Sequence, residues 1–301
     1  MISTALLAVY ALLVGLAAPR PLRRARWAHR APGLATTLWL GLLLSFVVSL
    51  ALVVHHLVVP ERHLHEGVLG ILHACGVAGA VSPGPVGDVA RMTAPLIVAL
   101  WPLGWFAAVL LRARRHRSHH ADMLDLVARP EPGLAATVLN HDTPAVYCLP
   151  GRARRIVLTS GALNALTPQQ LQAVLAHERA HLTGRHHLLT GAAEAFTRAF
   201  PGLPLATAAR TEMATLLEMV ADDRAVLVHP PHTLASAMCE VAAGRAPGYG
   251  FGAGGSTVVA RATRLLRPGK SPHPLAWTSI AVFALAAPML PFLFACGSAA
   301  G

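Results

Sequence analysis

Two histidines and a glutamate in the middle of the chain have the spacing of a metal-dependent hydrolase. His177 and His181 are four residues apart, so in a helix their imidazoles lie on one face and can both reach one zinc ion at about 2.0–2.1 Å. Glu178 points about 100° further round such a helix, where it can reach a metal-bound water without being a ligand. This His-Glu-x-x-His motif predicts two zinc ligands and a general base on one rigid element.

The residues around the motif predict the helix that it needs. Thr167 is a suitable N-cap, Pro168 suits the first helical position, and Gln170 completes a capping box. Apolar residues recur at helical spacing and would bury the other side of the helix: Leu171, Val174, Leu175 and Leu182. A chance motif in a chain with 17 histidines would rarely have this context, so we expect a capped helix that carries a metal site.

A catalytic zinc site needs a third protein ligand and an open position for water. The downstream candidates for the third ligand are Glu194, Glu212, Glu218 and Glu240. Glu218 is favoured because Asp222 follows four residues later on the same helical face, where its carboxylate can accept a hydrogen bond from a ligand histidine. We therefore predict one zinc ion per chain, with Glu218 as a ligand and Asp222 behind a ligand histidine.

The predicted reaction is metal-assisted hydrolysis of a peptide bond. Zinc would lower the pKa of its bound water towards about 7 and polarise the scissile carbonyl. Glu178 would take the water proton and pass it to the leaving amine. His186 and Arg224 lie close enough in sequence to be candidates for stabilising the oxyanion.

The composition of the chain indicates a membrane protein. Of its 301 residues, 54% are hydrophobic and only 13% are charged, which is too apolar for an ordinary soluble protein of this length. The net charge of +11 is carried almost wholly by arginines beside apolar runs, so we interpret it as membrane topology and expect no direct binding of nucleic acid. The scattered cysteines favour neither disulfides nor a thiolate metal site: Cys75, Cys148, Cys239 and Cys296.

Four apolar runs predict transmembrane helices, at 1–18, 34–59, 94–111 and 275–296. Arginines follow the first and third runs and precede the fourth, so the positive-inside rule places all three flanks in the cytoplasm of a plasma-membrane protein. Both termini are then outside. A cleavable signal peptide would have its positive charges before the apolar run, so we interpret the first run as a span.

These spans predict the domain limits. Residues 1–111 would form an N-terminal membrane domain with an external loop at 60–93, residues 112–272 a cytoplasmic peptidase domain, and residues 273–301 a fourth span with a short external tail. Residues 67–87 are uncharged but rich in glycine and proline, so we interpret them as part of the loop, and their entry into the membrane is left open. Histidines near this loop lack carboxylate or cysteine partners, and we interpret them as interfacial and not as a second metal site: His55, His56, His63, His65 and His73.

The predicted fold class is mainly α, with about four transmembrane helices and an α+β peptidase domain. Residues 145–149 and 155–159 are typical of two strands around a turn. Such a strand beside the metal-binding helix can pair with an extended substrate, or it can belong to a purely structural sheet. Residues 187–209 are apolar with a helical pattern that breaks at Pro201 and Pro204. We expect them to pack either under the metal site or against the bilayer. Glycine and proline dominate 245–256, which predicts a loop.

Several of these segments together resemble a known group of peptidases. The segments 146–151 (VYCLPG), 156–161 (IVLTSG), 171–181 and Glu218-x-x-x-Asp222 resemble the gluzincin core of BlaR/MecR-type membrane metallopeptidases and of the HtpX/CAAX-protease group. The position of the domain between a third and a fourth span is similar to the BlaR/MecR type. The resemblance implies His177, His181 and Glu218 as zinc ligands, with Glu178 as the base.

The resemblance also implies signalling by proteolysis, with a BlaI-like repressor as the substrate. The β-lactam receptors carry a large penicillin-binding sensor domain after the last span, whereas this chain stops at Gly301. We therefore do not expect this chain to recognise a β-lactam itself.

The sequence thus favours a membrane zinc endopeptidase that cleaves a cytoplasmic or membrane protein in regulated proteolysis. Its expected partners are a protein substrate and the lipid bilayer. The alternative within this class is an HtpX-like protease for membrane protein quality control. A non-catalytic membrane signalling scaffold is the alternative from another class, which Glu178 disfavours because a scaffold needs no base. The substrate, the stimulus and the oligomeric state are not determined by the sequence.

Overall fold

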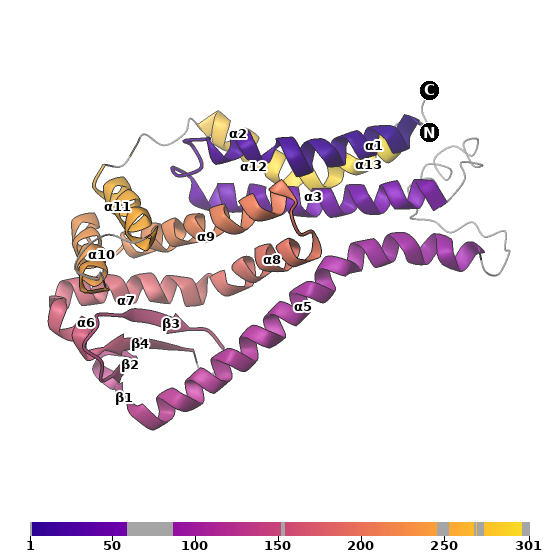
Figure 1. Ribbon diagram of the computed structural model, residues 1–301. Coiled ribbons are helices and arrows are strands. Elements are labelled where there is room, and N and C mark those ends of the chain that lie inside the picture. Colours follow the sequence, from indigo (N-terminus) through magenta and orange to yellow (C-terminus); the bar gives the residue numbers. More distant parts are fainter. Residues whose placement is uncertain are drawn as a thin grey trace.

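A bundle of long apolar helices lies at one end of the molecule and a small sheet with shorter helices at the other (Figure 1). The computed structural model describes residues 2–58, 87–151, 154–245, 253–267, 269 and 274–296. Most of the predicted external loop, including His63, His65 and His73, lies outside these residues. His55 and His56, at the end of α3 (Pro32–Val58), pack edge to face with ring centroids 5.7 Å apart.

Among the described residues, four helical segments are long and apolar enough to cross a membrane, which confirms the four spans expected from the sequence. They are Ser3–Arg23, Pro32–Val58, Thr93–Val127 and Trp277–Ala295. The first comprises α1 (Ile2–Leu12), the π-helical turn η1 (Leu13–Ala17) and α2 (Pro19–Arg23). The last comprises α12 (Pro274–Ala286), the 3₁₀ turn η3 (Ala287–Met289) and α13 (Leu290–Cys296), because Pro288 interrupts the α-helical hydrogen bonds. The chain is a multi-pass membrane protein.

Helix α3 is the centre of the membrane bundle. Gly41 allows α12 to approach closely, since a Cβ atom there would lie 2.4 Å from the carbonyl oxygen of Ala284. One turn further on, the Ser45 hydroxyl donates to the carbonyl oxygen of Ala287 at 2.7 Å and lies 2.8 Å from the Tyr10 hydroxyl of α1. Small residues and hydroxyl bonds of this kind hold helices together where the lipid provides no hydrophobic driving force.

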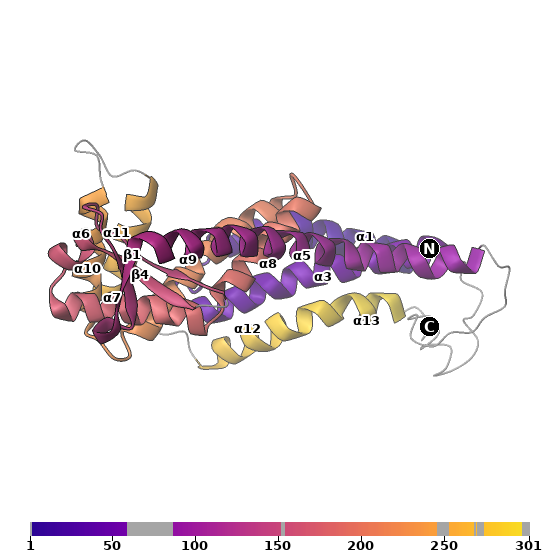
Figure 2. The ribbon, with the colours of Figure 1, turned by 90° about the horizontal axis from the view of Figure 1, so that it is seen from below.

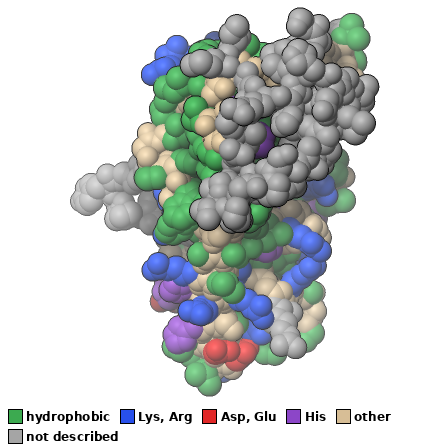
Figure 3. All heavy atoms as spheres, turned by 90° about the vertical axis from the view of Figure 1, so that its right-hand side faces the viewer, with side chains coloured by type: hydrophobic (Ala, Val, Ile, Leu, Met, Phe, Trp, Pro, Cys, Tyr) green, Lys and Arg blue, Asp and Glu red, His purple; other side chains and the backbone are tan. Residues whose placement is uncertain are grey.

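The third span has no break at the predicted domain boundary. Helix α5 runs without interruption over Gly87–Val127, so the arginine-rich stretch after Leu111 continues the same helix. Arg112, Arg114 and Arg115 are exposed. In Figure 3, apolar side chains cover the upper part of one face, and arginines gather in the lower part, on the side towards which α5 descends in Figure 1.

The sheet has four strands in the order β1-β2-β4-β3. The predicted strands are confirmed as β3 (Val146–Leu149) and β4 (Arg155–Thr159), which pair antiparallel. The sequence did not predict β1 (Ala128–Glu131) and β2 (Ala136–Leu139), which are joined by the 3₁₀ turn η2 (Pro132–Leu134). β2 lies parallel to β4. Within the described residues β3 is an edge strand, and it packs beside the metal-binding helix.

Six helices complete the domain. They are α6 (Ser160–Ala165), α7 (Pro168–Thr183), α8 (His186–Ala199), α9 (Pro204–Ala225), α10 (Pro231–Arg245) and α11 (Ala253–Leu266). Helix α7 packs between the sheet and α9, with α10 across its side. The loop predicted at 245–256 is wrong at its end, because α11 already begins at Ala253. Residues 246–252 lie outside the described part of the chain.

The apolar segment after α7 packs against the membrane helices. It forms α8 and the first half of α9, with the predicted break at Pro201–Pro204. Phe196 and Met213 are buried in the same cluster as Trp39 of α3, and the Trp101 indole of α5 donates to the carbonyl oxygen of Ala199 at 3.2 Å. Figures 1 and 2 both show α8 and α9 running from the sheet towards the membrane bundle. The peptidase helices and the membrane helices therefore share one core.

Candidate metal centre

Helix α7 begins where the sequence predicts. The Thr167 hydroxyl accepts from the backbone N–H of Gln170 at 3.3 Å, and the Gln170 side chain accepts from the backbone N–H of Thr167 at 2.8 Å. Both bonds of a capping box are present, which fixes the start of the helix and therefore the direction in which its later side chains point. His177 is buried and His181 half-buried.

His177, His181 and Glu218 bring three ligand atoms together. The two Nε2 atoms lie 3.1 Å apart, Glu218 Oε1 lies 3.3 Å from His181 Nε2, and Glu218 Oε2 lies 3.6 Å from His177 Nε2. A tetrahedral zinc site with bonds of about 2.0–2.1 Å has ligand atoms about 3.3–3.4 Å apart. The three observed separations are close to that spacing, with one oxygen of Glu218 beside each histidine. Among the described residues, this is the one group of histidine, cysteine and acidic side chains close enough to hold a metal ion.

The other third-ligand candidates are engaged elsewhere or lie outside this group. Glu194 pairs with Arg198 at 2.8 Å and with Arg210 at 2.9 Å. Glu212 lies 3.2 Å from Arg23 of α2. Glu240, on α10, is not a member of the metal group. The assignment of Glu218 is thus the one that the geometry supports.

Asp222 lies behind the histidine pair, one turn after Glu218 on α9. Its Oδ1 atom is 3.0 Å from Nδ1 of His177. The angle at the ring N–H does not meet the criterion for a hydrogen bond, so the two groups are in contact without one. Asp222 is fully buried. A carboxylate against Nδ1 favours the tautomer of His177 that directs the lone pair of Nε2 at a metal.

Arg261 is a site residue that sequence reasoning missed. The sequence counted it among the arginines that flank the fourth span, but in the structure it is buried on α11. Its Nε and Nη2 atoms donate to the two oxygens of Asp222 at 2.8 and 2.6 Å, and its Nη1 atom lies 2.8 Å from Oε2 of Glu218. Arg261 therefore clamps both acidic residues. No local signal identified it, because its partners are about 40 positions earlier in the chain.

The two residues proposed to stabilise the oxyanion, His186 and Arg224, have different surroundings. Nδ1 of His186 is 2.8 Å from Nδ1 of His181, on the opposite side of the His181 ring from the ligand group. His186 is placed to orient His181, and this position does not favour contact with a substrate oxyanion. Arg224 is exposed, and its positive charge contributes to a lowered pKa of His186.

Glu178 points into a cavity of about 190 Å³ beside the ligand group. The cavity is lined by Glu178, His177, Glu218 and Arg261, and by apolar residues of β3, α7, α10 and α11. Burial raises the pKa of Glu178, against the opposing effects of His177 and of a hydrogen bond from Cys148 on β3. Burial and the Glu178 charge raise the pKa of Cys148 to about 12, so its thiol keeps the proton that it donates.

The charges of the metal-free site depend on burial and on a few close partners. Burial would lower the pKa of His177, but Asp222 and Glu218 outweigh it and raise that pKa to about 9. Burial would raise the pKa of Glu218, but His177 and Arg261 hold it at about 2. Burial lowers the pKa of His181 to about 4, so this ring is already in the neutral form that binds metal.

Comparison with known proteins decides the class of this site. Residues 110–240 match the family model of peptidase family M48. This segment is similar to the M48 peptidase domain. The match includes all four strands of the sheet and helices α6 to α9, and M48 peptidases bind zinc, in agreement with the ligand group found here. M48 peptidases are hydrolases. A search of curated proteins and a search of solved structures gave no match.

Zinc content and activity should separate the ligands from the base. We expect His177→Ala, His181→Ala and Glu218→Ala to lose both bound zinc and proteolysis, because each removes a ligand. Glu178→Gln should keep about one zinc per chain and lose proteolysis by about 10²–10⁴-fold. Metal analysis of the purified protein and hydrolysis of an unstructured protein substrate measure the two effects. A native rate for Glu178→Gln would show that the base is assigned wrongly.

Removing Arg261 should destabilise the protein as well as the metal site. Arg261→Met leaves the buried Asp222 charge without its partner, at a cost of about 3–5 kcal/mol in unfolding free energy. Asp222→Asn should mainly weaken zinc binding, by about 10–100-fold. In Asp222→Asn/Arg261→Met, stability should partly return while zinc affinity stays low. Thermal unfolding and zinc titration measure these changes.

Arg264→Met is the matched control for the Arg261 variant. Arg264 is on the same helix and pairs with the half-buried Asp223 at 2.7 Å, so its loss should cost less, about 1 kcal/mol. Equal losses of stability for the two arginine variants would contradict the role of Arg261 as the clamp.

Proposed function

We propose that this protein is a membrane zinc endopeptidase, with His177, His181 and Glu218 as ligands and Glu178 as the base, which cleaves a cytoplasmic or membrane-inserted protein. The observation that carries the proposal is the group of His177, His181 and Glu218, in which the two Nε2 atoms lie 3.1 Å apart and the Glu218 oxygens lie 3.3 and 3.6 Å from them, a spacing that suits one zinc ion. The M48 domain match supports the same chemistry.

Glu178 has the surroundings of a proton-transfer group. A bound zinc ion would supply an acidified water and polarise the scissile carbonyl. The raised pKa of Glu178 suits a carboxylate that takes a proton from the attacking water and returns it to the leaving amine. The Cys148 thiol of β3 donates a hydrogen bond to this carboxylate, so the sheet positions the base as well as helix α7 does.

The edge of β3 and the adjoining cavity suit an extended peptide. Within the described residues β3 pairs with β4 on one side, so its other edge has backbone groups available for strand addition. The cavity beside Glu178 has an apolar wall formed by Val146, Leu234, Met238, Val241 and Val258. We propose that the substrate lies along β3 and places an apolar side chain in this cavity.

The arginine flanks support a cytoplasmic active site. Arginines follow the first span, occupy the second half of α5, and precede the last span. By the positive-inside rule this distribution supports a peptidase domain in the cytoplasm and both termini outside. The domain limits of 1–111, 112–272 and 273–301 belong to this proposal, although α5 crosses the first limit as one helix.

The finer proposal is regulated proteolysis of a transcriptional repressor. A cytoplasmic site cannot cut an extracellular protein, so the direct substrate is cytoplasmic or membrane-inserted. The resemblance of the catalytic segments and of the domain position to BlaR/MecR-type peptidases makes a dimeric, BlaI-like repressor the leading candidate. HtpX-like quality control would use the same site and differs only in the substrate.

The proposed topology is tested with reporter tags in cells. Tags after Arg30, after His120 and near Gly254 should report the cytoplasm, while tags near Ser82 and at Gly301 should report the outside. Each fusion is checked for retained proteolysis, so that a displaced domain is not mistaken for the native arrangement. A cytoplasmic signal at Gly301 would contradict four spans with this orientation.

The signalling role is tested by following the candidate repressor after induction. With native enzyme, immunoblots should show its cleavage, and transcripts of its target genes should rise. With Glu178→Gln, both responses should be lost. If the repressor stays intact and derepression is the same in both strains, the signalling proposal is wrong. Accumulation of damaged membrane proteins in the Glu178→Gln strain alone would then identify quality control.

A further inference from the structure

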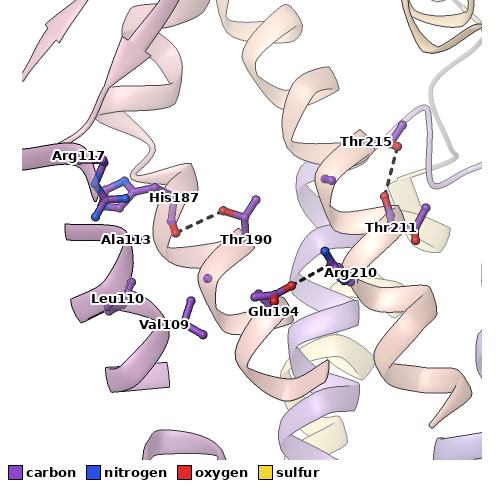
Figure 4. A pocket seen from close by; sticks show the side chains of 12 residues that line it. Val109, Leu110, Ala113, Arg117, His187, Thr190, Glu194, Arg210, Thr211 and Thr215 are labelled. Carbon is purple, nitrogen blue, oxygen red and sulfur yellow. Dashed lines mark hydrogen bonds and ion pairs between the residues drawn. The ribbon is translucent and has the colours of Figure 1, made fainter. Parts of the chain in front are cut away.

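A second, larger cavity lies between α5, α8 and α9, on the membrane side of the metal centre. Its volume is about 710 Å³, within the range of about 300–1,000 Å³ typical of small-molecule sites. Val109, Leu110 and Ala113 of α5 form one wall, and Gly191 and Ala214 contribute to the walls from α8 and α9. Figure 4 shows these three helices around the cavity.

Two buried nitrogen atoms at one end of this cavity lack a hydrogen-bond partner. They are Nε of Arg117 and Nδ1 of His187. The two side chains lie side by side in Figure 4, and the Arg117 charge contributes to lowering the pKa of His187. An arginine Nε is always a donor, and neutral imidazole can donate from one ring nitrogen. Leaving buried donors unpaired costs about 1–3 kcal/mol each, so this end of the cavity is suited to an acceptor.

The other polar groups of the cavity are already engaged. The hydroxyls of Thr190, Thr211 and Thr215 donate to carbonyl oxygens of their own helices. Glu194 is neutralised by the two arginines that it contacts, Arg198 and Arg210. Arg117 has no carboxylate partner among the described residues. The pKa of His187 is lowered first by burial, then by the charge of Arg117, and further by the charges of Arg185 and Arg154. The Arg117 end of the cavity therefore has an excess of positive charge and attracts an anion.

The depth of the cavity identifies the kind of anion. Val109 and Leu110 are near the end of the apolar part of α5, and exposed arginines follow directly at 112, 114 and 115. The cavity is thus at the boundary between hydrocarbon and water, where phospholipid phosphates lie. Its apolar walls face the hydrocarbon side and its cationic end contains Arg117.

We propose that this cavity binds an anionic phospholipid, with the phosphodiester accepting from Arg117 and His187 and part of the acyl chains against Val109 and Leu110. Basic pockets between membrane helices commonly bind such head groups. The site is separate from the metal centre, and its occupancy does not depend on which protein the peptidase cleaves. Because α8 and α9 also carry His186 and Glu218, a bound lipid would hold together the helices that support the metal ligands.

The lipid site is tested on the purified full-length protein in detergent by native mass spectrometry. Dioleoyl phosphatidylglycerol should bind at least about tenfold more tightly than dioleoyl phosphatidylcholine, which has the same chains but no net charge. Arg117→Gln should weaken phosphatidylglycerol binding by about tenfold or more. Arg115→Gln, which changes an exposed arginine of the same helix outside the cavity, should leave it unchanged.

Two further measurements, competition by soluble phosphates and photolabelling, complete the test. Inorganic phosphate and glycerol phosphate should not compete at concentrations that far exceed the lipid, and full competition would assign the site to a free phosphate compound. A photoreactive phosphatidylglycerol should label native protein within 109–117 and 187–194, which needs no variant to fold. Labelling confined to other helices, equal affinity for the two lipids, or equal effects of the two arginine variants would overturn the proposal.

Discussion

The burial of Asp222 is the constraint on which the metal centre depends. A carboxylate with no exposed surface costs several kcal/mol unless it is paired and hydrogen-bonded. Two helices far apart in sequence supply the partners: α11 contributes Arg261 and α7 contributes His177. The same arginine also contacts Glu218, so one guanidinium fixes both the ligand carboxylate and the carboxylate behind the ligand histidine. The site can form only when α7, α9 and α11 have packed together.

The metal centre is also fixed relative to the membrane. Helices α8 and α9 continue from the site into the core around α3, where Phe196, Leu205 and Met213 are buried with Trp39. A rigid connection of this kind leaves little freedom for the peptidase helices to move away from the bilayer. It suits cleavage of substrates at or near the membrane surface, and the same two helices line the larger cavity.

Elements with local signals were predicted well. The limits of α7 follow from Thr167, Pro168 and Gln170, because a capping box forms between residues three apart in sequence. The spans follow from uninterrupted apolar runs, because the backbone in lipid must satisfy its hydrogen bonds within the helix. Strands β1 and β2 were missed, and in β1 the reason is that its sequence ARPE contains a proline and charged side chains that are unusual in a strand.

By itself, the sequence predicted the proposed chemistry of this protein: His177, Glu178 and His181 on one capped helix, a candidate carboxylate at Glu218, and four apolar runs long enough to cross a membrane. Only the tertiary structure decided which glutamate meets the histidines, that α5 continues through the expected boundary, and that Arg261 is a clamp and not a flanking charge. The physical reason is that spacing along one helix fixes which side chains share a face. Pairing a buried charge depends on helices that meet only after folding.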